Sequence, residues 1–152
     1  MVEIAWYTGE RARLRGLFEL AEDSAERLQT AIGQGRVLAA MDGGEIVGFL
    51  QLVAGDEVEL TAMAVAEDRQ GTGIGRALVA RAVDECRAEG FSALLVATAA
   101  AGAGTLRFYQ RQGFRMLRIE RDAFMPSDGY PEGITIDGIP LRDRVWLSMA
   151  LR

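Results

Sequence analysis

A glycine-rich segment is the part of this sequence best suited to chemistry. It reads Gln70-Gly71-Thr72-Gly73-Ile74-Gly75-Arg76 and lies between a predicted strand, residues 57–65, and a long amphipathic helical pattern, residues 72–89. Glycines leave room for a ligand to approach the backbone, and the unpaired amides of a helix start attract an anion. We therefore predict a loop that binds phosphate or pyrophosphate. The alternative is a glycine-rich turn that binds nothing.

Two other phosphate-binding patterns fit this segment poorly. The dinucleotide-binding fingerprint needs a third glycine where the chain has Arg76, and an acidic residue about 20 positions later, where the chain has Ala and Val. The phosphate loop of nucleotide hydrolases needs a lysine, and the sequence contains no Lys. The nearby Arg69 and Arg76 can either reach a phosphate or form surface ion pairs.

The residue types that are missing exclude several classes of site. The chain has no His, no Asn and a single cysteine, Cys86, so Ser-His-Asp and Cys-His catalysis, an intrachain disulfide and a Cys/His zinc site are all excluded. Cys86 lies on the apolar side of the long helical pattern, where a core residue is expected. The net charge of −5 opposes nonspecific binding to nucleic acid or an anionic membrane. We therefore expect a small-molecule partner, with no metal, no nucleic acid and no membrane.

The elements that must position the glycine-rich segment alternate in type along a chain of 152 residues, the size of one domain. Asp42-Gly43-Gly44 predicts a hairpin turn, Ser24 a helix cap, and the apolar run 91–98 a strand buried on both faces. Strands are predicted at 2–7, 36–41, 45–53, 57–65, 91–98, 114–122 and 144–151, and helices at 11–23, 25–32, 72–89 and 102–112.

This order of elements predicts the fold class. We expect one α/β (α+β) domain, residues 1–152, with a mixed, mostly antiparallel twisted sheet of six to seven strands and about four helices. Residues 124–152 are expected to form a C-terminal loop and strand extension of it. No apolar stretch of 18 residues occurs and the first residues lack the order of a secretory signal, so a cytoplasmic location is expected.

A second motif, Phe108-Tyr109-Gln110-Arg111-Gln112-Gly113-Phe114, ends the last predicted helix. Together with Gln70-x-x-Gly73-x-Gly75 between a strand and a helix, this motif resembles the GNAT superfamily of N-acetyltransferases. Members of that family bind the pyrophosphate of acetyl-CoA at the first motif and carry a Phe-Tyr-x-x-x-Gly-Phe pattern at the second. The resemblance covers residues 2 to about 122. Members often carry Asn and Ala ahead of the Phe-Tyr pair, where this chain has Gly102 and Thr105.

The resemblance implies acetyl-CoA as co-substrate and assigns it two binding segments. In this family a bulge splays two parallel strands apart beside the pyrophosphate loop. The backbone at the end of the preceding strand then pairs with the pantetheine arm and polarises the thioester carbonyl. The implied residues are Met63, Ala64 and Val65 for the arm, and Gln70, Gly71, Thr72, Gly73, Ile74, Gly75 and Arg76 for the pyrophosphate.

Glu59 is the candidate general base. An alkylamine with a pKa of about 10.4 is almost wholly protonated at neutral pH, so its acetylation benefits from a base. Glu59 lies eleven residues before Gln70, where some family members place a catalytic glutamate. The alternative is a solvated strand end with surface carboxylates. Strand alternation puts Glu57, Glu59, Thr61 and Met63 on one face, and Val58, Leu60, Ala62 and Ala64 on the other.

Tyr109 is the candidate general acid. The resemblance places its hydroxyl near the sulfur of the cofactor, and a phenol can donate a proton to a departing thiolate. The alternative is an aromatic core residue whose hydroxyl is bonded elsewhere.

The predicted function is N-acetyl transfer from acetyl-CoA to a primary amine, by direct attack in a ternary complex. The acceptor is a small-molecule amine or a peptide amine. The alternatives are a CoA-binding protein of the same fold without turnover, and a transferase that uses another acyl-CoA. The irregular segment 124–142 is long enough to form either the acceptor pocket or a dimer contact, so a homodimer stays open.

Overall fold

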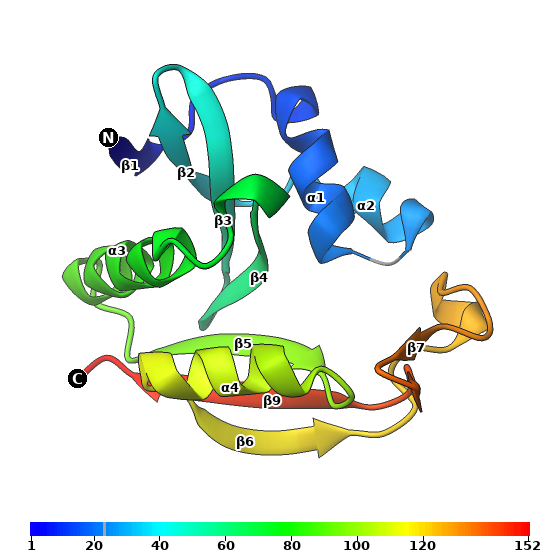
Figure 1. Ribbon diagram of the computed structural model, residues 1–152. Coiled ribbons are helices and arrows are strands. Elements are labelled where there is room, and N and C mark those ends of the chain that lie inside the picture. Colours follow the sequence, from blue (N-terminus) through cyan, green and yellow to red (C-terminus); the bar gives the residue numbers. More distant parts are fainter. Residues whose placement is uncertain (23) are drawn as a thin grey trace.

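The computed structural model describes residues 1–22 and 24–152, which form a seven-stranded sheet flanked by helices (Figure 1). The strands follow the spatial order β1-β2-β3-β4-β5-β9-β6, and neighbours are antiparallel apart from the parallel pair β4 and β5. The predicted mixed, mostly antiparallel fold is therefore confirmed. The strands of this sheet are β1 (Val2–Trp6), β2 (Arg36–Asp42), β3 (Glu45–Ala54), β4 (Val58–Val65), β5 (Ala93–Ala99), β6 (Arg115–Glu120) and β9 (Arg144–Ala150).

The helices form two layers on opposite faces of the sheet. On one face, Leu14, Phe18 and Leu28 pack on Val37 and Phe49, and the Phe18 and Phe49 rings stack at 4.2 Å. On the other face, α3 and α4 cover the larger apolar core. No helix in the described part of the chain is both long and apolar enough to cross a membrane. The helices are α1 (Arg15–Ala21), α2 (Ala25–Ala31), α3 (Ile74–Ala88) and α4 (Ala103–Gln112), with short 3-10 turns at Arg11–Leu14, Glu67–Arg69 and Pro126–Asp128.

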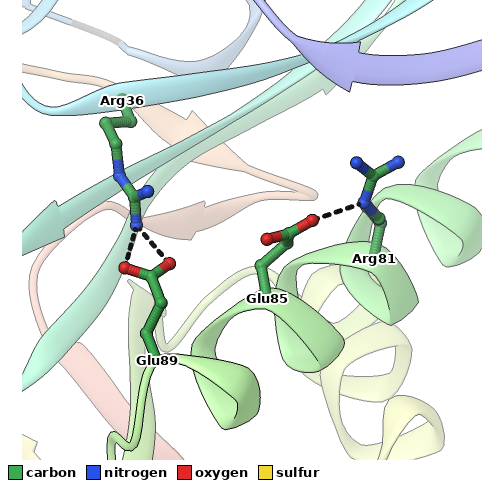
Figure 2. A network of polar contacts seen from close by, with 4 residues as sticks. All are labelled: Arg36, Arg81, Glu85 and Glu89. Atoms are coloured by element: carbon green, nitrogen blue, oxygen red, sulfur yellow. Dashed lines mark hydrogen bonds and ion pairs between the residues drawn. The ribbon is translucent and has the colours of Figure 1, made fainter.

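Polar contacts along one side of α3 attach it to the first two strands. Figure 2 shows Arg36 of β2 paired with Glu89 at 2.7 Å, and Arg81 paired with Glu85 at 2.9 Å. Arg81 also donates to the carbonyl of Ile4 in β1, at 2.8 Å. Exposed ion pairs contribute little stability, so the apolar face of α3 supplies most of the attachment and the charges fix its orientation.

The predicted hairpin and helix cap are both confirmed. Gly43 and Gly44 adopt φ values of +57° and +88°, the left-handed pair that a tight two-residue hairpin needs between β2 and β3. The Ser24 hydroxyl accepts from the amide of Arg27 at 3.3 Å and so caps α2.

Two predicted elements differ from the structure. The helix expected at 11–23 begins as a 3-10 turn and α1 ends at Ala21, while Asp23 lies outside the described residues. The strand expected to be buried on both faces is buried on one, because Leu94 and Val96 are buried while Ala93, Leu95 and Ala97 are half-buried. The half-buried side faces a cavity described below, which an apolar sequence pattern does not reveal.

The C-terminal segment contributes to the sheet interior. After β6 the chain forms the 3-10 turn at Pro126–Asp128 and a two-stranded ribbon, β7 (Thr135–Ile136) and β8 (Ile139–Pro140). It then returns as β9 between β5 and β6. The segment between β6 and β9 therefore lies beside the ends of strands that are far from it in the sequence (Figure 1).

Candidate active site

The glycine-rich segment forms the turn from β4 into α3. Gly71 and Gly73 adopt φ values of +78° and +90°, and Gly73 is the N-cap of α3. An added Cβ at either glycine would meet no atom within 4 Å. These two positions therefore need glycine for its left-handed backbone, and the space beside them is open to a ligand.

The backbone amides of residues 71–76 are available to such a ligand. Within the described residues, none of them donates a hydrogen bond to a protein group. The Gly73 carbonyl accepts from the amide of Ala77 at 3.0 Å, which begins the helix and leaves its first amides without an intrahelical acceptor. Gly71, Thr72 and Gly73 are exposed. The loop therefore offers amides without protein acceptors at a helix start, as an anion-binding loop requires.

Side chains around the loop hold its shape. The Gln70 side-chain amide donates to the Val65 carbonyl at 3.1 Å, and the Thr72 hydroxyl donates to the Arg69 carbonyl. Arg69 forms an ion pair with Asp42 at 2.6 Å, and this hydrogen bond lowers the pKa of Asp42. Of the two uses considered for Arg69, the structure therefore has the ion pair.

A gap separates β4 from β5 beside this loop. The two strands pair only at Val58 with Leu94, Glu59 with Leu95 and Leu60 with Val96, although β4 continues to Val65 and β5 to Ala99. Residues 61–65 of β4 therefore have β3 on one side and no strand on the other within the described chain. An extended ligand arm can pair with backbone groups of this kind.

The gap begins at a β-bulge centred on Thr61. In the pairing of β3 with β4, Gln51 faces Ala62 and Leu52 faces Leu60, which leaves Thr61 as the extra residue. The Thr61 hydroxyl donates to the Gln51 side-chain oxygen at 2.7 Å.

Gln51 holds the bulge from inside the protein. Its side chain is fully buried, and its amide nitrogen donates to the carbonyls of Ala31 at 2.6 Å and Gln34 at 2.8 Å. This residue was not among those predicted from the sequence. The available signal was a lone amide side chain inside the apolar run of residues 46–53.

The bulge makes the predicted face assignment of β4 wrong. Val58 and Leu60 pack in the core beneath α3, but so do Met63 and Val65, whereas Ala62 and Ala64 pack on the side of α1 and α2. Met63 therefore lies on the face opposite Glu59. One extra residue in a strand shifts the two-residue alternation by one, so every side chain beyond Thr61 changes face.

A cavity of about 940 Å³ lies next to the gap. Its floor includes Glu59, Thr61 and Ala62 of β4 and Thr98 of β5. Its walls come from α1 and α2 on one side and from residues 124–136 on the other. The irregular C-terminal segment therefore contributes one wall of this cavity.

Glu59 is half-buried in this cavity floor. Burial raises the pKa of its carboxyl, and the positive charge of Arg144 partly opposes that shift. Arg144 also lines the cavity and is itself paired with Glu120 at 3.3 Å. The carboxylate of Glu59 is therefore a stronger proton acceptor than an exposed glutamate.

The two walls of the cavity meet at Ser24. Besides capping α2, its hydroxyl donates to the carbonyl of Gly129 at 2.6 Å. A Cβ at Gly129 would lie 3.0 Å from both the Ser24 hydroxyl and the Glu26 carboxylate, so the contact is close.

Tyr109 of α4 lies in the larger apolar core. Its ring is 6% exposed and packs edge-on against Phe108 at 5.2 Å and Phe114 at 5.5 Å. Burial raises its pKa to about 12. Its hydroxyl makes no hydrogen bond with a described protein group, and Tyr109 does not line the cavity that contains Glu59. The Phe108 ring lies where a Cβ on Gly75 would meet it at 3.5 Å, which links α4 to the glycine-rich loop.

The sequence pattern of the Acetyltransferase (GNAT) family matches residues 5–114, which include the strand gap and both motifs. The chain belongs to the GNAT acetyltransferase family. The predicted enzyme class, an acyl-CoA-dependent N-acetyltransferase, is thereby confirmed.

Individual relatives of this acetyltransferase agree with that assignment. It is 31% identical over 140 residues to the uncharacterized N-acetyltransferase YvbK of Bacillus subtilis, covering 91% of this chain and 89% of that one. It is 32% identical over 92 residues to the ribosomal protein bS18-alanine N-acetyltransferase of Escherichia coli, covering 60% and 62% of the two chains. A GNAT acetyltransferase from Elizabethkingia anophelis, solved with acetyl-CoA bound, has a TM-score of 0.89 and 30% identity over 98% of this chain and 97% of that one.

Proposed function

We propose that this acetyltransferase moves the acetyl group of acetyl-CoA to a primary amine that binds in the cavity beside Glu59. The observation that carries the proposal is the continuity of three features among the described residues: amides at 71–76 that donate to no protein group, a strand edge at 61–65 with no neighbouring strand on the side of β5, and a cavity that begins at the same bulge. A solved relative from Elizabethkingia anophelis contains acetyl-CoA.

The residues present fit the donor. The amides of Gly71 to Arg76 and the positive end of the α3 dipole suit a pyrophosphate, and the absence of a Cβ at Gly71 and Gly73 lets it approach. The backbone of Met63, Ala64 and Val65 has no neighbouring strand on the side of β5 among the described residues, which supports its pairing with the extended arm. Bound acetyl-CoA supplies a thioester whose acyl carbon accepts the amine nitrogen and whose sulfur leaves.

The chain's own groups then handle two protons. Glu59 takes a proton from the amine, directly or through water, because its raised pKa makes it the stronger base. Tyr109 gives a proton to the departing sulfur, because a phenol with a pKa of about 12 keeps its proton at neutral pH. Direct attack of the amine on the thioester in a ternary complex is the simplest reaction order. A covalent acetyl-cysteine route is disfavoured, because the one cysteine, Cys86, is buried.

The cavity supports a small-molecule amine as acceptor. The hydrogen bond from Ser24 to the Gly129 carbonyl joins its two walls, which narrows the access of an acceptor to the cavity on that side. Acidic side chains of the lining, Glu22, Glu26 and Asp128 together with Glu59, outnumber Arg27 and Arg144. A cationic amine is favoured in such surroundings. A peptide amine is the second acceptor class, and the Escherichia coli relative is named for one.

The test has two parts. Isothermal titration should detect binding of acetyl-CoA, and an assay of thiol release should find turnover with polyamines, amino acids, aminoglycosides or short peptides. Glu59→Gln and Tyr109→Phe should each lower kcat while leaving the Kd for acetyl-CoA nearly unchanged. Binding without turnover for any acceptor would favour a CoA-binding role, and faster release from another acyl-CoA would change the donor. Absence of acetyl-CoA binding would refute the proposal.

A further inference from the structure

The strand β6 leaves one edge of the sheet uncovered. Within the described residues it pairs with β9 on one side and with no strand on the other, and Figure 1 shows it at the end of the sheet. Three of its six residues are large, apolar and exposed: Met116 at 56%, Leu117 at 55% and Ile119 at 67%. An unpaired strand edge with exposed apolar side chains is a surface for pairing with another strand.

A bulge in β6 decides which of its side chains share a face. Met116 faces Leu147 of β9 and Arg118 faces Trp146, so Leu117 is an extra residue. The consequence is that Met116 and Ile119 lie together on one face of the sheet. Arg115, Arg118 and Glu120 lie together on the other, where Arg118 stacks over Trp146 at 4.8 Å and Glu120 accepts from the Trp146 ring nitrogen at 3.0 Å.

From this arrangement we propose that two copies of the chain pair through β6, antiparallel and about a two-fold axis between Leu117 and Arg118. In that register Arg115 faces Glu120 of the second copy, and Met116 faces Ile119 of the second copy. Residues directly opposite in an antiparallel pair share a face, and both of these pairs meet that condition. Without the extra residue, Arg115 and Glu120 would lie on opposite faces and could not meet.

The charges of this strand fit a second copy of itself. Arg115 is exposed, and Glu120 uses one carboxylate oxygen for both Trp146, at 3.0 Å, and Arg144, at 3.3 Å. Among the described residues its other oxygen has no hydrogen-bond partner, so it can accept from Arg115 of the second copy. The two-fold axis repeats this pair, and the four apolar residues, Met116 and Ile119 of both copies, lie together on the opposite face of the joined sheet.

The pairing also adjoins the cavity. The carboxylate that would meet Arg115 of the second copy already holds Trp146 and Arg144, which both line the cavity containing Glu59. The proposed interface therefore immobilises Glu120, whose carboxylate supports the cavity wall. The pairing itself depends neither on the acceptor nor on the proposed catalytic residues.

The first test is the mass in solution. Sedimentation or light scattering of the full chain at micromolar concentrations should give twice the 16.5 kDa of one chain. Ile119→Glu should give the single-chain mass, because it places a carboxylate opposite Met116 in both halves of the interface. Ile139→Glu is the matched control, since Ile139 is an exposed strand isoleucine at 53% outside β6, and it should stay dimeric. A single-chain mass for the parent, or a dimer that survives Ile119→Glu, would overturn the proposal.

The second test reads the register. In the double variant Met116→Cys with Ile119→Cys, mild oxidation should link the two chains, because the cysteines face each other across the axis. Each single variant should not link, since its two cysteines are two ladder steps of about 3.4 Å apart along the strands and about 4.8 Å apart across them, roughly 8 Å in all and beyond the roughly 7 Å limit between bridged Cα atoms. Buried Cys86, whose pKa is raised to about 11, should stay reduced. Equal linking in the single variants, or a dimer that does not link in the double variant, would refute this register.

Discussion

Replacing Gly73 by Ala tests the pyrophosphate loop most directly. Gly73 has φ +90° and ψ 4° and begins α3. Its missing Cβ faces open space, with no atom within 4 Å, so the substitution creates no clash inside the protein. The cost is conformational, because an L-residue in the left-handed region is disfavoured by about 1–2 kcal/mol.

This cost should appear in the affinity for acetyl-CoA. The loop is exposed, so in the free variant it can relax to a negative φ, and binding must then restore the left-handed turn that aligns the amides. A penalty of about 1–2 kcal/mol corresponds to a rise in Kd of about 5- to 30-fold. The added methyl group also occupies the open space before α3, which should raise the Kd for acetyl-CoA further.

Gly90 supplies a matched control at the other end of the same helix. It has φ +89° and also no atom within 4 Å of an added Cβ. Gly90→Ala should lower Tm by at least as much as Gly73→Ala and leave the Kd for acetyl-CoA unchanged. Titration calorimetry and thermal unfolding of both variants check this. An unchanged Kd for Gly73→Ala, or an equal rise for Gly90→Ala, would show that the loop does not hold the cofactor.

Three further outcomes are expected. Gln51→Leu should lower the free energy of unfolding in urea by about 1–3 kcal/mol, because it removes the two hydrogen bonds that the buried Gln51 side chain donates to the carbonyls of Ala31 and Gln34 and the one that it accepts from Thr61; an unchanged midpoint would contradict the role of Gln51. Burial raises the pKa of folded Glu59 above its unfolded value, so its contribution favours the native state at low pH and is lost as pH rises through the folded pKa. Glu59→Gln should therefore stabilise the protein at pH 8, and this gain in stability should disappear near pH 4, about the ordinary carboxyl range. The same substitution should remove the acidic limb of the pH profile of kcat/KM; if that limb persists, another group titrates there. Ser24→Ala should cost about 1 kcal/mol in stability, because α2 loses its N-cap. It should also raise KM for the acceptor but not for acetyl-CoA, because the bond to Gly129 between the cavity walls is lost, and Ser24→Thr is the conservative comparison. Equal changes in both KM values would argue against a contact specific to the acceptor wall.

The features predicted correctly from the sequence are those set by short stretches of chain. Gly43 and Gly44 are the residues that a two-residue hairpin needs, and Ser24 offers the hydroxyl that a helix start lacks. Gly71 and Gly73 likewise take left-handed conformations for reasons of their own backbones. Each of these signals depends on neighbours within a few residues, so the order of residues is enough to identify it.

The cavity beside Glu59 depends on contacts that no local pattern encodes. The bulge at Thr61 exists because Gln51, ten residues earlier, reaches Thr61 with one end of its amide and the end of α2 with the other. That bulge turned Met63 to the face opposite Glu59, against the expectation from simple alternation. The cavity likewise requires residues 124–136 to reach Ser24, about a hundred positions away in the chain.

By itself, the order of amino acids determined that this chain has a strand, a glycine-rich turn with exposed helix-start amides and a helix in succession, because backbone freedom and helix-end amides are local properties. Only the folded arrangement decided where Glu59 points, where the strands part and which distant segment closes the cavity, since those follow from which strand edges pair and from one buried amide side chain that joins them.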